Sequence, residues 1–407
     1  MTARDPEAAP AAVMGTRDTW ISFTDLAVWA FLMYGLGTAT PYLRTDLHIT
    51  AFEAGLHGSA LAVGILIAGF VTDRIARLVG IHWLPDLEVA IIALGIALFA
   101  LAPSLPVSLS GAMLMGLGGA ILSTDNNVRL GRVKGEGSRR LLAQAYGLSM
   151  IMAGAAPLAI GLAAAHLASW RVAMAIPVAV FALLAFLRSR EAEPPSSVVK
   201  AKGSLTLPYW VAVLVLALSV SIEFSFVYWG SSMVGRRAGI ASSDATLLAG
   251  LFVVGMFLGR TAVGRGLGGG RSPRTVLAAG LIVSLTGACL VWVSTVAALS
   301  GLGLLLGGLG TAALYPVSLN VALQSAPNAQ MAASARAAMA TGVALLVVPS
   351  TLGLVSDAIG LIGAWAIIPA IALTALAVVA TMPGSEESAA QDLAASPEAR
   401  PLGEAPA

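Results

Sequence analysis

The chain has 407 residues, of which 57% are hydrophobic and only 11% are charged, and its net charge at pH 7 is +2. A soluble domain carries roughly 25% charged residues, so this composition predicts an integral membrane protein. The small net charge, with no Lys/Arg run interleaved with aromatic residues, argues against nucleic-acid binding. The single cysteine, Cys289, excludes a disulfide within the chain.

Residues 1–19 carry charges of both signs and no apolar core. This pattern does not match a cleaved signal peptide. We expect a cytoplasmic tail here, with the first hydrophobic helix acting as an uncleaved targeting signal.

Twelve apolar stretches follow, each near the roughly 20 residues that a helix needs to cross the hydrocarbon layer. No stretch shows the period-2 alternation of a membrane barrel strand. The sequence therefore predicts an all-α membrane protein with twelve transmembrane helices. The expected spans are 20–42, 52–72, 83–102, 105–126, 141–166, 170–187, 208–230, 244–262, 273–294, 297–320, 335–355 and 361–382.

The distribution of positive charge predicts the orientation. If the N-terminus is cytoplasmic, 19 of the 23 Lys and Arg residues fall on the cytoplasmic side and 4 fall on the opposite side. This bias is the one that the positive-inside rule describes. We expect both termini in the cytoplasm and the protein in a plasma membrane, as a multi-pass protein of the bacterial cytoplasmic membrane.

Polar stretches divide the chain. Residues 188–207 hold Glu, Pro, Ser and Lys residues and predict a flexible cytoplasmic linker between the sixth and seventh helices. The expected organisation is a six-helix bundle over 20–187, the linker 188–207, a second six-helix bundle over 208–382 and a disordered tail over 383–407.

An internal repeat supports this division. Three pairs of helices share small residues and prolines at a separation of 191 or 192 positions, which indicates two pseudo-symmetric halves related by an axis along the membrane normal. The matching positions are Pro157 and Gly161 with Pro349 and Gly353, Gly116 and Gly119 with Gly307 and Gly310, and Gly64 and Arg74 with Gly255 and Arg265.

Two loop segments resemble the loop motif of the major facilitator superfamily. They are Gly69-Phe-Val-Thr-Asp73-Arg74-Ile-Ala-Arg77 and Gly255-Met-Phe-Leu-Gly259-Arg260-Thr-Ala-Val-Gly264-Arg265. The sequence departs from the motif at Ala76, where the family usually has glycine. The resemblance implies that Gly69, Asp73, Arg74, Arg77, Gly259, Arg260 and Arg265 form contacts that hold the halves together in one state and break as they move. The alternative is that the charged residues only fix helix depth at the membrane surface.

Two further resemblances concern the direction and kind of transport. The segment Gly154-Ala-Ala-Pro157-Leu-Ala-Ile-Gly161-Leu162 is similar in part to the fifth-helix motif of antiporters in this superfamily, which slightly favours export and adds Pro157 and Gly161 to the gating residues. The Gly-rich fourth and tenth helices, which lead to Asp125-Asn126-Asn127, Tyr315-Pro316 and Asn320, resemble the fucose-permease-like branch.

Ionisable residues well inside a span are expensive in hydrocarbon and point to function. Glu223 lies past the middle of the seventh span, with no Lys or Arg within ten residues. Because desolvation disfavours its charged form, we expect Glu223 to bind and release a proton. The resemblance implies that its helix lines a central cavity. The alternative is a neutral glutamate that stabilises packing, with Ser219 as its partner.

A second set of polar and aromatic residues lies on helices that the resemblance places around the cavity. Asp25 is a second candidate for proton coupling, or a carboxylate that favours the helix N-terminus. The candidate substrate contacts are Tyr34, Asn126, Asn127, Tyr228, Trp229, Tyr315 and Asn320. For the aromatic residues the alternative is anchoring at the membrane interface, and for the asparagines an ordinary cluster at a helix end.

The resemblance implies a secondary active transporter of a small organic solute that works by alternating access, coupled to protons and slightly favoured as a drug or metabolite exporter. A sugar/proton symporter or a facilitator is the alternative, and a non-transporting receptor is a remote one.

The four histidines are scattered, so no metal site is expected. We expect no cofactor, and a monomer in the lipid bilayer. Since the embedded polar groups form no catalytic set by spacing, we do not expect an enzyme.

Overall fold

The computed structural model describes residues 16–80, 82–131, 136–167, 169–188, 205–263, 271–326 and 330–382, and these residues form fourteen helices and no strand. The helices are α1 (Thr16–Leu47), α2 (Ala51–Val79), α3 (Leu84–Ala100), α4 (Leu105–Gly131), α5 (Glu136–His166), α6 (Arg171–Leu187), α7 (Leu207–Ala238), α8 (Ser242–Ala262), α9 (Pro273–Val293), α10 (Ala297–Thr311), α11 (Leu314–Gln324), α12 (Gln330–Ile359), α13 (Leu361–Ala364) and α14 (Ile367–Ala380).

The all-helical membrane architecture predicted from the sequence is confirmed for the described residues. Ten segments in this part of the chain are long and apolar enough to cross a membrane, with α10 and α11 forming one of them and α13 and α14 another. Helices α3 and α6 have 17 residues each, so the count of twelve spans stays a prediction.

The tenth predicted span, 297–320, is not one continuous helix. Helix α10 ends at Thr311 and α11 begins at Leu314. Pro316 lies in the first turn of α11, where its ring and its missing N–H disfavour a continuous helix through the preceding turn. The break is therefore encoded locally.

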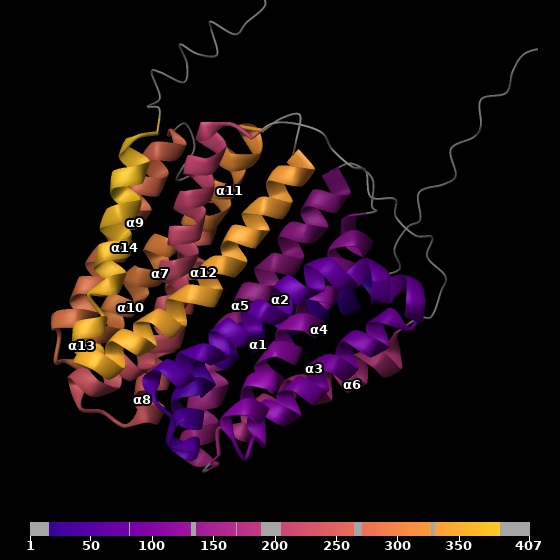
Figure 1. Ribbon diagram of the computed structural model, residues 1–407, viewed down its shortest axis with the longest axis horizontal. Helices are drawn as coiled ribbons and strands as arrows, with labels where there is room; N and C mark the ends of the chain where they lie inside the picture. The colour runs from indigo at the N-terminus through magenta and orange to yellow at the C-terminus, as the bar shows by residue number, and fades with distance from the viewer. Residues whose placement is uncertain are drawn as a thin grey trace, which may run out of the picture.

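The helices form two groups that lie side by side (Figure 1). We call α1–α6 the N-group and α7–α14 the C-group. The end of the bundle where α1 ends and α2 begins is called the outer end, because the charge distribution predicts that it faces away from the cytoplasm; the opposite end is called the inner end.

Helix ends are set by residues that satisfy the free backbone groups. At the start of α2, the Thr50 hydroxyl accepts from the Glu53 amide at 3.1 Å, and the Glu53 carboxylate accepts from the Thr50 amide at 2.8 Å. This reciprocal pair is a capping box. Gly239 caps the end of α7, and its φ of 65° is the left-handed conformation that glycine adopts without strain.

Within each group, helices approach so closely at glycines that a side chain would not fit. A Cβ atom on Gly111 of α4 would lie 2.6 Å from the carbonyl oxygen of Gly95 in α3, and one on Gly303 of α10 would lie 2.9 Å from that of Gly287 in α9. Both members of the second pair come 192 positions after the first. The internal repeat is thus visible as the same backbone contact made twice.

The contacts also correct the register of the repeat by one position. A Cβ atom on Gly116 would meet the Leu61 carbonyl in α2, and one on Gly308 would meet the Phe252 carbonyl in α8. The structural counterpart of Gly116 is therefore Gly308, not Gly307 as expected from the sequence. Gly307 packs against the Phe226 ring instead.

Two glycines of α2 make a matched test of this packing. In Gly64→Ala the added methyl would meet the Met113 carbonyl, whereas in Gly69→Ala it would meet nothing within 4 Å. We expect Gly64→Ala to destabilise the protein by about 1–3 kcal/mol through overpacking. Gly69→Ala should be neutral or stabilise by up to about 1 kcal/mol, because alanine favours the helix. Thermal unfolding of the purified variants measures both; equal melting temperatures would contradict the packing argument.

Candidate functional site

The two groups meet along three helix pairs: α2 with α12, α5 with α8, and α1 with α7. Figure 1 shows α2 and α12 side by side. At the first contact a Cβ atom on Gly55 would meet the Pro349 carbonyl, and at the second a Cβ atom on Gly161 would lie 2.9 Å from the Leu247 side chain. The contact between groups is therefore as close as the packing within them.

The repeat builds this interface twice. A Cβ atom on Gly58 of α2 would lie 3.0 Å from the Pro349 ring, and one on Gly250 of α8 would lie 3.7 Å from the Pro157 ring. The two glycines are 192 positions apart, and so are the two prolines. The structure places Pro157 and Gly161, two of the predicted gating residues, on α5 where it packs against α8.

Polar contacts join the groups near the outer end. Asp357 of α12 accepts from the backbone amides of Ala51 and Phe52 at 2.9 and 2.7 Å, so that a C-group carboxylate caps an N-group helix. The Tyr42 hydroxyl of α1 donates to Thr246 of α8 at 2.9 Å. Deeper between α2 and α12, Ser59 donates to the Leu346 carbonyl. These bonds join the two groups in the outer half of the bundle.

A buried carboxylate lies at the centre of the contact between α1 and α7. Glu223 is only 7% exposed, and its Oε1 accepts a hydrogen bond from the Tyr34 hydroxyl at 2.5 Å. The same hydroxyl lies 3.6 Å from the Met256 sulfur of α8. Arg260 lies near enough to act on Glu223 electrostatically. The proposed packing partner Ser219 instead bonds the Val215 carbonyl.

Aromatic residues surround this carboxylate. The rings of Phe224 and Tyr34 lie 6.1 Å apart, and those of Phe224 and Tyr228 lie 6.5 Å apart. The buried Tyr228 hydroxyl has no hydrogen-bond partner among the described residues. Trp229 donates from Nε1 to the Pro349 carbonyl of α12 at 3.3 Å, a bond within the C-group. Three predicted residues, Tyr34, Glu223 and Tyr228, are thus brought together between α1 and α7, whereas Trp229 contacts α12.

The second predicted carboxylate belongs to a different cluster. Asp25 is 1% exposed, accepts from Arg188 at 2.6 Å and lies 3.4 Å from the amide nitrogen of Asn126. These residues come from α1, the end of α6 and α4, all in the N-group near the inner end. Asp25 is therefore neither a simple helix-terminus carboxylate nor a neighbour of Glu223.

Of the remaining predicted substrate contacts, Tyr315 lies near enough to Glu223 and Arg260 to interact with them electrostatically, and Asn127 and Asn320 join neither cluster. Asn127 bonds the Tyr146 hydroxyl of α5 at 3.0 Å, and Tyr315 of α11 bonds Thr341 of α12. Asn320 is exposed. These residues lie on the helices that the sequence predicted, but their side chains make different contacts and do not form one site.

The loop-motif residues lie near the inner ends of α2 and α8. Gly69, Arg74 and Arg77 are exposed, while the side chain of Asp73 and the whole of Arg265 lie outside the described residues. A Cβ atom on Gly259 would lie 2.8 Å from the Leu309 carbonyl, and Arg260 donates to the Ala312 carbonyl at 3.4 Å. The described part of the motif in α8 thus anchors that helix to the break between α10 and α11.

The sequence reasoning missed one buried acid. Glu88 of α3 is 1% exposed, and neither of its oxygens has a hydrogen-bond partner among the described residues. It acts electrostatically on the cluster of Asp25, Asp125, Arg129 and Arg188. The signal was available, because Glu88 is an ionisable residue inside a predicted span. No three His, Cys, Asp or Glu side chains of the described chain are grouped as metal ligands.

This fold is that of a multi-pass membrane transporter. The sequence matches the family described as Major Facilitator Superfamily over residues 26–268, and the chain belongs to this superfamily.

Solved structures share the fold at low sequence identity. A bacterial homologue of the human lysosomal transporter Spinster, inward-facing and unoccupied, is 14% identical with a TM-score of 0.70, over 90% of this chain and 97% of that one. A mutant of the nucleoside transporter NupG is 13% identical with a TM-score of 0.72, over 90% and 99%. A POT family transporter in complex with 5-aminolevulinic acid is 13% identical with a TM-score of 0.74, over 89% and 95%. No curated protein sequence matches the chain.

The Asp25–Arg188 pair makes a stability prediction. Removing one partner leaves a buried charge uncompensated, which costs about 3 kcal/mol or more. We expect Asp25→Asn and Arg188→Gln each to lower the free energy of unfolding, and the double variant to recover part of the loss. Denaturant unfolding of the four proteins gives the coupling energy. Strictly additive losses would show that the pair is not coupled.

The contact of Asp357 with the start of α2 leads to a second prediction, about separation of the two groups at the outer end. Asp357→Ala removes the carboxylate that caps α2, and loss of a cap costs about 1 kcal/mol. Because the cap spans the two groups, we expect the loss to favour opening of the outer end. Distances between spin labels on Thr45 and Ser243, in a Cys289→Ser background, should broaden toward longer values. Glu53→Gln, which alters the capping box within α2 alone, is the matched control and should leave the distances unchanged.

Proposed function

We propose that this protein is a proton-coupled secondary transporter of a small organic solute, and that Glu223 is its proton-binding residue. The observation that carries the proposal is the buried hydrogen bond between Tyr34 and Glu223. It lies at the only described contact in which a buried carboxylate of one group receives a hydrogen bond from the side chain of the other.

The chemistry of this bond supports coupling. An ionised carboxylate accepts a stronger hydrogen bond than a neutral acid does. Loading a proton onto Glu223 therefore weakens the link between α1 and α7 and makes separation of the groups easier. Losing the proton restores the link. A group that titrates at a contact between two moving bodies connects proton binding to their movement.

The interface supports alternating access. The contacts between α2 and α12 and between α5 and α8 are related by the repeat, so that each group presents equivalent surfaces to the other. In the structure, Asp357 and Ser59 join α12 to α2, and Tyr42 joins α1 to α8. We propose that these contacts break when the groups rock and that a solute site between them then faces the other side.

The proposed direction is export, supported only by Pro157 and Gly161 at the interface of α5 and α8. A facilitator that needs no proton is the second candidate, and it is separated from the first by experiment. The solute class is accessible through ligand-induced thermal stabilisation of the purified protein with sugars, organic acids and amphipathic drugs at pH 5.5 and 8. A ligand at 100 times its dissociation constant stabilises by about 2.7 kcal/mol.

With a solute in hand, Glu223→Gln tests the coupling. The amide is nearly the same size but carries no exchangeable acid proton. In proteoliposomes we expect Glu223→Gln to lose transport driven by a pH gradient by tenfold or more and to retain solute exchange without a gradient. Gradient-driven transport at the wild-type rate would refute the role of Glu223 and favour the facilitator.

Tyr34→Phe tests the link between the groups. The variant leaves the Glu223 carboxylate without its donor, so we expect coupled transport to fall and its dependence on pH to shift. Tyr209→Phe is the matched control, because its hydroxyl is also buried but donates to the Ala333 carbonyl within the C-group at 2.8 Å. Identical pH profiles for Tyr34→Phe and Tyr209→Phe would show that the Tyr34 bond is only structural.

A further inference from the structure

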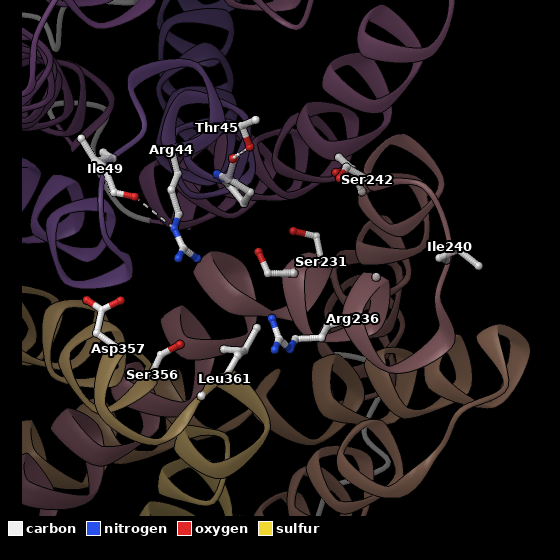
Figure 2. Close-up of a pocket in the computed structure, with 15 residues that line it drawn as sticks. Arg44, Thr45, Ile49, Ser231, Arg236, Ile240, Ser242, Ser356, Asp357 and Leu361 are labelled. Carbon is white, nitrogen blue, oxygen red and sulfur yellow. Dashed lines mark hydrogen bonds between the residues drawn. The ribbon is translucent and has the colours of Figure 1, made fainter.

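A polar cavity of about 730 Å³ opens at the outer end, between the two groups. Its walls come from the end of α1 and the turn after it, from the end of α7 and the start of α8, and from the turn between α12 and α13. Figure 2 shows Arg44 and Arg236 extending into this cavity from different walls. The cavity is remote from Glu223, which is not among its lining residues.

The two arginines lack the acidic partners that such residues usually have. Arg44 donates from Nε to the Ile49 carbonyl at 3.3 Å, which leaves its two terminal nitrogens free of any acceptor in the described chain. Arg236 is exposed and has no acceptor among the described residues. The lining carboxylate, Asp357, already accepts from two amides at the start of α2. The cavity therefore holds an excess of unpaired positive charge.

Two other arginines at this end lie outside the cavity. Arg171 forms an ion pair with Asp46 at 2.8 Å. Arg237, the direct neighbour of Arg236, donates to the Val293 carbonyl at 2.5 Å, outside the cavity. Positive charge is disfavoured on the side opposite the cytoplasm, and the charge distribution predicts that this end faces that side, so two arginines without acidic partners in one cavity make it a candidate anion site.

A buried hydroxyl gives a second, independent indication. Ser231 lines the cavity and is only 4% exposed, yet its oxygen has no hydrogen-bond partner among the described residues. Figure 2 shows Ser231 in the space between the two arginines. A buried hydroxyl without a partner is costly, and a ligand oxygen placed between the arginines would satisfy it.

We infer that this cavity binds a small, water-soluble organic anion, with a carboxylate or phosphate group held between Arg44 and Arg236 and a hydroxyl-rich remainder facing Ser231 and the other lining serines and threonines. Guanidinium groups bind such anions through paired hydrogen bonds. The inference rests on the proposed transport function, because it makes the cavity the outer docking position of the solute and makes that solute an anion.

Binding of defined anions to the purified, delipidated protein tests the inference. The probes are gluconate and inorganic phosphate, with glucose as the neutral counterpart of gluconate. By calorimetry in chloride-free buffer we expect gluconate and phosphate to bind, glucose not to bind, and the affinity to fall as salt is added. Arg44→Gln and Arg236→Gln should each weaken binding about tenfold or more.

Two variants keep the result interpretable. Arg237→Gln removes a neighbouring arginine that faces away from the cavity and should bind like the wild type. Arg236→Lys keeps the charge without the paired donors and should bind with an affinity between those of the wild type and Arg236→Gln. Equal affinities for gluconate in the wild type and in the Arg44→Gln/Arg236→Gln double variant would overturn the inference.

A further binding experiment in a membrane distinguishes a soluble anion from a lipid headgroup as the ligand of the cavity. In nanodiscs of phosphatidylcholine alone, gluconate should still bind, and added phosphatidylglycerol should compete weakly. Stabilisation by phosphatidylglycerol alone, with no binding of gluconate or phosphate, would assign the arginines to lipid and overturn the solute assignment. Anion binding retained in Glu223→Gln supports the inference whether or not that variant remains coupled, so failure of the coupling proposal is distinguishable.

Discussion

Close approach of helix backbones is the constraint on which this architecture depends. Lipid tails are as apolar as leucine side chains, so helices in a bilayer gain little by burying apolar groups against one another. They gain dispersion contacts when their backbones come near, and only glycine permits this at positions such as Gly111 and Gly303, where a Cβ atom would meet a neighbouring carbonyl. The 44 glycines of the chain therefore do not serve mainly to make the backbone flexible. Many of them fix which helix faces which.

The same constraint acts between the two groups, with one difference. Polar contacts occur inside each group as well, as between Asp25 and Arg188, but those at the interface between groups, the helix cap from Asp357 and the buried hydrogen bond to Glu223, join the two bodies. The strength of a contact between apolar surfaces does not depend on pH or on a bound solute, whereas the strength of a polar contact does. The placement of ionisable and hydrogen-bonding groups at the interface gives ligands and protons a means of acting on the arrangement of two otherwise rigid bodies.

Much of the fold could be predicted from the sequence because lipid imposes a simple length rule. The lengths of the apolar runs predicted the helices, and the internal repeat predicted the two groups. The register was wrong by one at Gly307 because adjacent glycines cannot be distinguished without knowing which way each faces. The rule for buried charge identified Glu223. It could not identify Tyr34, which lies 189 positions away, because the partner depends on how α1 is rotated against α7. The same rule applied to Glu88 would have found the inner acidic cluster.

The cap that Asp357 places on α2 has a consequence for the backbone itself. The amide hydrogens of Ala51 and Phe52 belong to the N-group, but their acceptor belongs to the C-group. Most amides in a membrane helix are protected from exchange with water by bonds inside the same helix, whatever the helix does as a body. The amides of Ala51 and Phe52 are protected only while Asp357 of the C-group remains in contact with the start of α2. Their deuterium uptake therefore records the fraction of time that the unlabelled, unmodified protein spends open to that side.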